Sequence, residues 1–173
     1  MELNIQRFAI DLSTAGIYLS YCVEETAGTR PTTGYTKLTG VKSTPSLNPA
    51  PETLETTTLE ATEWKTYIDG LKDPGGALEF TFNLTAELID QWDTLMTAYT
   101  TAKAAGKKVY FAVNIPQLKV TSGQTSTSQA YVFPGNPSAM GLPETSVSAV
   151  LETTNYITPT GPVERVAMPT LAQ

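Results

Sequence analysis

One helical segment lies between two segments of alternating apolar and polar residues, and this arrangement constrains the fold more than any other feature of the sequence. Residues 77–84, ALEFTFNL, and 108–115, KVYFAVNI, place an apolar side chain at every second position. A period of two is typical of a strand with one face in a core. Similar alternation occurs in residues 16–23, 129–133 and 146–154. We therefore expect about six or more strands around one helix.

The segment TAELIDQWDTLMTAYTTAKAAGKK, which begins at Thr85, predicts a helix of about four turns. Thr85 can cap its start, and Lys103 complements the negative end of the helix dipole before Gly106 ends it. Six apolar residues at helical spacing are expected to form a stripe packed on the sheet: Leu88, Ile89, Trp92, Leu95, Met96 and Tyr99. The predicted fold class is mainly β with one α-helix (α+β).

Size and charge limit the functions that the chain can have. A length of 173 residues fits one domain with one core. The net charge of -6 argues against tight binding of DNA or RNA, because that affinity comes largely from Lys and Arg. The N-terminal sequence lacks the pattern of a signal peptide, and no apolar run reaches the ~18 residues of a membrane helix. We therefore expect a protein made in a cytoplasm, with no membrane partner.

The sequence gives no sign of catalytic or metal chemistry. Histidine is absent, which removes the commonest general base and metal ligand. The single cysteine, Cys22, lies in an apolar run and is interpreted as a small core residue. The acids at positions 52, 55, 60 and 63 lie in a Thr-rich segment without an apolar pocket, so they are interpreted as solvated. We predict no catalytic residue, metal or cofactor.

Residues 42–60 form a long Pro- and Thr-rich segment inside the expected domain, which spans residues 15–160. Loops of this length are usually functional or disordered. From Leu54 onward the β-branched content predicts a strand, and Leu47, Leu54 and Leu59 supply apolar side chains that need a neighbour. Copies of the chain arranged head-to-tail in a ring would protect exposed strand edges and supply that neighbour.

The two ends of the chain, residues 1–14 and 161–173, are expected to be arms without cores of their own. The polar segment 120–129 is interpreted as a mobile hairpin loop. Exposed aromatic rings raise the alternative of a monomeric carbohydrate-binding β-sandwich. Trp64 and Tyr67, however, are three residues apart, which would place them on opposite faces of a regular strand. A flat sugar-binding platform is therefore poorly supported.

The run ETLETTTLEATEWKTYIDGLKDPGGALEFTFNLT, the helix, GKKVYFAVNIP and VFPGNPSAMGLPETSVSAVLETTNYITPTG together resemble the major tail tube proteins of long, non-contractile-tailed bacteriophages. The resemblance covers residues 15–161 in order. Its most specific parts are residues 57–59, 67–73 and 143–144. It implies a β-sandwich or half-barrel flanked by a helix, which assembles into hexameric rings that stack into a tube for DNA ejection. Another ring-forming virion protein, such as a tail terminator, is the structural alternative.

The resemblance also implies roles for particular residues and partners. The long loop would act as a strap between subunits, through Pro45, Leu47, Pro49, Pro51, Leu54 and Leu59. An acidic lumen wall would repel DNA in transit, and its candidates are Glu52, Glu55, Glu60, Glu63, Glu79 and Glu152. Expected partners are further copies of the chain, the tape-measure protein, the tail terminator and distal tail proteins. Double-stranded DNA would pass without being held. The expected location is the virion tail, assembled in the host cytoplasm.

Overall fold

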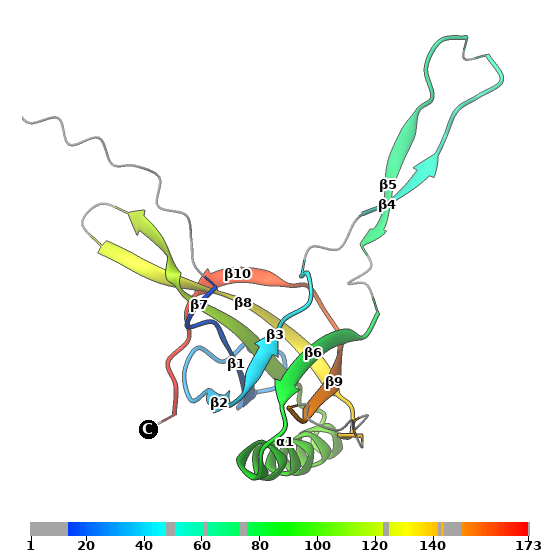
Figure 1. The fold of residues 1–173 in the computed structure, drawn as a ribbon. Helices are drawn as coiled ribbons and strands as arrows, with labels where there is room; N and C mark the ends of the chain where they lie inside the picture. The colour runs from blue at the N-terminus through cyan, green and yellow to red at the C-terminus, as the bar shows by residue number, and fades with distance from the viewer. Residues whose placement is uncertain are drawn as a thin grey trace, which may run out of the picture.

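The computed structural model describes residues 14–47, 51–60, 62–72, 76–122, 125–141, 143 and 150–172. These residues form one helix and ten strands, which confirms the predicted fold class (Figure 1). In chain order the elements are β1 Tyr18–Val23, β2 Thr36–Leu38, β3 Val41–Ser43, β4 Pro51–Glu55, β5 Tyr67–Lys72, β6 Leu78–Asn83, α1 Ala86–Ala104, β7 Val109–Ser122, β8 Thr125–Pro137, β9 Glu152–Pro159 and β10 Glu164–Ala167.

The main sheet follows the strand order β2-β1-β7-β8-β9-β6-β3, with every neighbouring pair antiparallel. Its two end strands, β2 and β3, are joined by only Thr39 and Gly40. The sheet therefore curls into a nearly closed half-barrel (Figure 1). Gly40 makes this turn at φ +76°, and a Cβ there would lie 2.9 Å from the carbonyl oxygen of Asn83. Only glycine fits both the backbone conformation and the space.

The alternating segments bury one face, as the sequence predicts. In β6, Leu78, Phe80 and Phe82 are buried. In β7, Val109, Phe111 and Val113 are buried, and the Phe111 ring stacks on Phe133 of β8 at a centroid distance of 5.9 Å. β7 extends to Ser122, and β8 starts at Thr125. Most of the segment 120–129, which was interpreted as a loop, is therefore paired strand.

Helix α1 covers one end of the half-barrel (Figure 1). The backbone N–H of Leu88 donates to the Thr85 hydroxyl at 3.2 Å, which caps the first turn. The Trp92 side chain is completely buried: its ring meets Phe82 edge to face at 5.7 Å, and its Nε1 donates to the Ser138 carbonyl at 3.0 Å. These contacts attach the helix to β6 and to the segment that follows β8.

The buried stripe of α1 differs from the predicted one at Ile89. Leu88 and Leu95 are completely buried together with Trp92, and Met96 and Tyr99 pack partly buried against the same core. Ile89, by contrast, is 40% exposed. It follows Leu88 by one position, and successive helical residues are about 100° apart around the axis. The inclusion of Ile89 in the core stripe was therefore wrong.

The C-terminal segment belongs to the sheet, although the sequence predicts an arm over residues 161–173. β10 pairs antiparallel with residues 129–132 of β8, and the backbone of Tyr35 bonds to Thr170 and Ala172. These contacts cover a second apolar cluster on the outer face of the sheet, formed by Tyr35, Ala112, Ala130 and Val132 with Val166, Met168 and Leu171. The predicted N-terminal arm, 1–14, lies outside the described residues except for Thr14.

Two polar side chains are buried near the start of β7. The Glu24 carboxylate accepts hydrogen bonds from the backbone N–H of Lys108 at 2.7 Å and of Gly28 at 3.1 Å. It thereby ties the loop after β1 to the entry of β7. The Tyr35 side chain is completely buried, and its hydroxyl donates to the Pro31 carbonyl at 3.1 Å. Burial raises the pKa of Tyr35 above its usual range.

Candidate assembly surfaces

Strands β4 and β5 form a two-stranded antiparallel sheet that is separate from the main sheet and extends away from the half-barrel (Figure 1). Leu54 lies opposite Ile68, and Glu55 lies opposite Tyr67. Gly70 allows close packing, because a Cβ there would lie 3.0 Å from the Glu52 carbonyl oxygen. The strand expected from Leu54 onward thus starts earlier, at Pro51, and ends at Glu55. Sequence reasoning missed its partner, β5.

Threonine hydrogen bonds continue this hairpin beyond its strands. The backbone N–H of Thr56 donates to the Thr66 carbonyl at 2.8 Å, and the N–H of Thr66 donates to the Thr57 hydroxyl at 3.0 Å. The threonine-rich composition therefore has a structural use, since hydroxyls bond to nearby backbone groups in turns. One ion pair, from Lys65 to Glu55 at 3.0 Å, also crosses the hairpin.

The hairpin exposes large apolar side chains that a self-contained hairpin would not need. Five of them are 48% to 107% exposed: Leu54, Leu59, Trp64, Tyr67 and Ile68. An isolated two-stranded hairpin is marginally stable in water at best. Leu54 and Ile68, which lie opposite each other, form an exposed apolar pair of the kind that occurs at contact surfaces in folded proteins. The hairpin thus has the composition of a segment that is stabilised by a neighbouring surface.

The residues predicted to form a strap fall into two groups. Pro45 and Leu47 are partly buried, and Leu47 packs against the core of its own chain. Leu54 and Leu59 stand exposed on the hairpin. Pro51 starts β4, and Pro49 lies outside the described residues. The part of the chain that extends away from the half-barrel is therefore the hairpin from residue 51 to residue 72, and not the whole of the predicted loop 42–60.

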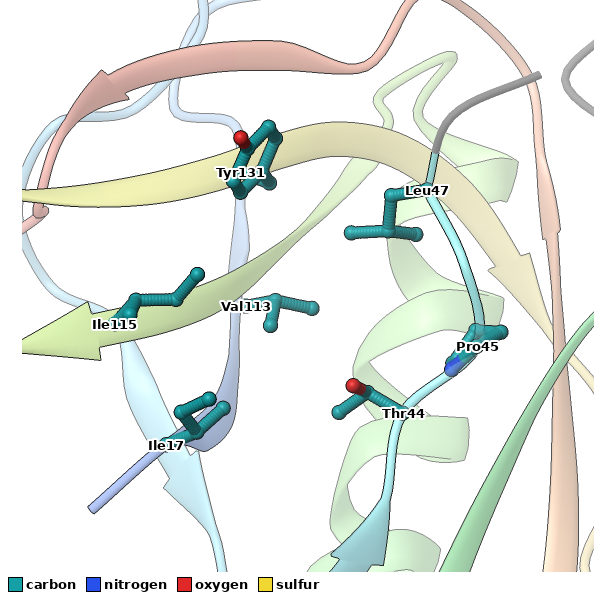
Figure 2. Close-up of a pocket in the computed structure, with 7 residues that line it drawn as sticks. All are labelled: Ile17, Thr44, Pro45, Leu47, Val113, Ile115 and Tyr131. Carbon is teal, nitrogen blue, oxygen red and sulfur yellow. The ribbon is translucent and has the colours of Figure 1, made fainter. Parts of the chain in front are cut away.

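An apolar groove of about 400 Å³ lies at the mouth of the half-barrel, between β7, β8 and the segment that follows β3 (Figure 2). Val113 and Ile115 of β7 and Tyr131 of β8 form its floor, and the segment after β3 forms the opposite wall (Figure 2). Among the described residues, the lining consists of Ile17, Thr44, Pro45, Leu47, Val113, Ile115 and Tyr131. No charged side chain is among these lining residues. The groove is therefore suited to an apolar side chain.

The predicted acidic residues divide between two surfaces. Glu52, Glu55, Glu60 and Glu63 are all exposed on the hairpin. Glu79 of β6 and Glu152 of β9 lie on the outer face of the half-barrel, because their neighbours along each strand point into the core.

This β6–β9 outer face is polar and open over the described residues. Besides the two glutamates it carries Thr81, Thr154 and Tyr156, which alternate with the buried positions. A hollow of about 430 Å³ beside it is lined by Ala139, Gly141, Pro143, Glu152, Thr153, Thr154 and Tyr156. Lys42 forms an ion pair with Glu152. Glu152, paired with Lys42, is the only carboxylate among these lining residues. Acid–base catalysis on a sugar would need two.

Other chemistry-bearing groups are equally sparse. Within the described ranges, no three His, Cys, Asp or Glu side chains are close enough to hold a metal ion. Burial, and secondarily the nearby Glu25 charge, raise the pKa of the Cys22 thiol, which disfavours the reactive thiolate. Over the same residues, no helix has both the length and the apolar character needed to span a membrane.

Comparisons with known proteins place the fold. No protein-family profile and no curated protein sequence matches the chain. Among solved structures, the fold is similar to that of a chain in the cryo-EM structure of the anti-feeding prophage (AFP) baseplate, determined with sixfold symmetry. The TM-score is 0.56 at 5% sequence identity, and the match covers 92% of this chain and 98% of that chain. The likeness extends over nearly the whole of both chains and concerns the fold.

Proposed function

We propose that this chain is a structural subunit of a phage-tail-like particle, which associates with copies of itself into hexameric rings that stack into a tail tube. The observation that carries the proposal is the β4–β5 hairpin, which holds five exposed apolar side chains away from its own core. The fold supports it, because a chain of the same architecture occurs in a sixfold-symmetrised baseplate. The role is non-enzymatic: the chain acts by association.

The hairpin and the rest of the chain are different surfaces, so a contact between the hairpin of one subunit and the body of the next is head-to-tail. Such contacts build closed rings when the rotation between subunits closes, and open helices when it does not. In such a ring, neighbouring subunits would also cover strand edges of the half-barrel that are exposed in a single chain.

The β6–β9 outer face is the proposed lumen wall. The outer face of β7 and β8 is covered by the C-terminal segment, whereas no segment that the structure describes covers the face that carries Glu79 and Glu152. Its hydroxyl, amide and carboxylate groups give DNA phosphates no cluster of cations to bind, since Lys42 is paired with Glu152. The remaining repulsion is screened within about 8 Å at physiological salt. DNA would therefore pass through such a channel without being held.

If the chain forms a tail tube, its partners are defined by that role. They are further copies of this chain, a tape-measure protein enclosed during assembly, and a tail terminator and distal tail proteins at the two ends. The location is the tail of the particle. A terminator role for this chain itself would use the same hairpin but would give single rings that do not stack.

Sedimentation velocity over a wide concentration range tests the proposal. The wild-type chain should form oligomers as its concentration rises, with no change in tryptophan fluorescence when glycans are added. In the matched variant, residues 52–71 are replaced by a short Gly-Ser linker, which leaves Leu47 on the core. This variant should fold and stay monomeric. A wild-type chain that is monomeric throughout and responds to a glycan through Trp64 would refute ring assembly and favour the carbohydrate-binding alternative.

A further inference from the structure

We propose that the apolar groove at the mouth of the half-barrel is the receptor for the hairpin of a second copy, with Trp64 as the side chain that enters it. The inference rests on the proposed self-association and adds the two surfaces that meet. Both are present in one chain: an exposed apolar side chain on the hairpin and an apolar hollow on the body (Figure 2).

The groove matches a large aromatic side chain in size and chemistry. Its volume of about 400 Å³ is within the ~300–1,000 Å³ range of pockets that enclose small ligands. Ile115, Leu47 and Tyr131 are each only partly buried in the single chain, so an entering ring would remove further apolar surface from water. The second hollow, beside β9, contains a carboxylate and two threonines and is a poorer place for a tryptophan.

Trp64 is the best-suited knob on the hairpin. Its side chain is 83% exposed, and it lies beyond the Glu55–Tyr67 pair that ends the two strands. Tryptophan is enriched among residues that dominate binding energy when they fill a pocket. The polar residues around it in the sequence, mostly threonines and glutamates, suit the hydrated rim of such a contact.

In the single chain Trp64 is outside the groove: it is 83% exposed and is not among the residues that line it. Leu47 lines the groove, and β4 begins at Pro51, so the base of the hairpin lies near the groove. At about 3.3 Å per residue, the five residues of β4 carry the far end roughly 17 Å away from that base. Figure 1 shows the hairpin extending away from β7 and β8. The occupant is therefore the hairpin of another copy.

Site-directed cross-linking between two full-length variants tests this contact. One chain carries Glu63→Cys, which is exposed and next to Trp64, and the other carries Ile115→Cys, so that Trp64 itself is kept. The mixture is treated with a short bismaleimide. We expect a cross-linked heterodimer from this mixture. Val120→Cys is the matched control, because Val120 is on the same strand, is exposed and is not among the groove residues. It should cross-link weakly with Glu63→Cys, as should the wild-type chain, whose only thiol is Cys22.

A binding measurement supplies a second readout. Trp64→Ala should weaken association at least about 30-fold, the loss expected for an interface residue worth 2 kcal/mol or more. Tyr156→Ala, which removes an exposed aromatic ring from the β6–β9 outer face, should leave the association constant unchanged. The melting temperature of dilute Trp64→Ala should equal that of the wild type, which shows that the variant folds.

The outcomes separate this inference from ring assembly itself. Rings that form normally with Trp64→Ala, with no cross-link between Glu63→Cys and Ile115→Cys, would overturn the groove contact and leave the tube proposal standing. The groove contact would also be overturned if deletion of residues 1–13 abolishes association and Trp64→Ala does not. Association would then depend on the N-terminal segment and not on the hairpin. A specific cross-link in a chain that never forms rings would support the contact and overturn the tube.

Discussion

Replacing Trp92 with Ala should lower the free energy of unfolding by about 3–5 kcal/mol, the range observed when a buried large aromatic residue is truncated in a core. Three losses combine here. The completely buried indole leaves a cavity, its edge-to-face contact with Phe82 is worth about 0.5–1.5 kcal/mol, and its N–H bond to the Ser138 carbonyl contributes about 1 kcal/mol.

The assay is urea unfolding followed by circular dichroism, at a concentration low enough to keep the chain monomeric. Trp64→Ala is the matched control: it makes the same substitution at an 83% exposed site and should change the free energy of unfolding by less than about 0.5 kcal/mol. Trp92→Phe keeps a ring against Phe82 but removes the donor, and should fall between the two. A loss of less than about 1 kcal/mol for Trp92→Ala would refute the reasoning, because the helix would not depend on this contact.

Three further perturbations have defined outcomes. Glu24→Ala leaves two backbone N–H groups without their acceptor and should cost about 2–4 kcal/mol in urea unfolding, since hydrogen bonds to charged groups are worth about 1.5–3 kcal/mol each and additivity is incomplete. Burial raises the folded-state pKa of Tyr35 above its unfolded value of about 10. The contribution of the neutral phenol to the free energy of unfolding should therefore be complete below pH ~10 and be lost as the pH rises above it. Tyr35→Phe should make this alkaline loss of stability shallower in thermal melts. Gly40→Ala should destabilise more than Gly28→Ala, because both glycines have positive φ but only at Gly40 would the new Cβ meet backbone; equal melting temperatures would contradict this.

The sequence was sufficient for the elements whose pattern is local. The alternation in β6 and β7 and the capped helix α1 are each visible within a window of about twenty residues, and burial follows from them. Ile89 shows the limit of this reasoning. Helical spacing defines an apolar stripe wider than the contact surface, and only the position of the sheet decides which edge of the stripe is exposed.

The elements missed from sequence depend on distant partners. β5, with the sequence YIDGLK, has a glycine inside it and little alternation, so its strand character comes from pairing with β4. β10 has four residues and lies between two prolines, Pro162 and Pro169, which favoured an arm; the open edge of β8 gives it a partner. The groove could not be predicted either, because Leu47, Ile115 and Tyr131 meet only in the folded chain.

Electron microscopy of the purified full-length chain, across concentrations that span its association, tests the central claim most directly. The claim is that copies of this half-barrel complete one another around a hollow axis. We expect sixfold rings with a central channel, and stacked tubes at the highest concentrations, with the β6–β9 outer face lining the channel. Particles that are single globules at every concentration, or assemblies without a central channel, would contradict it.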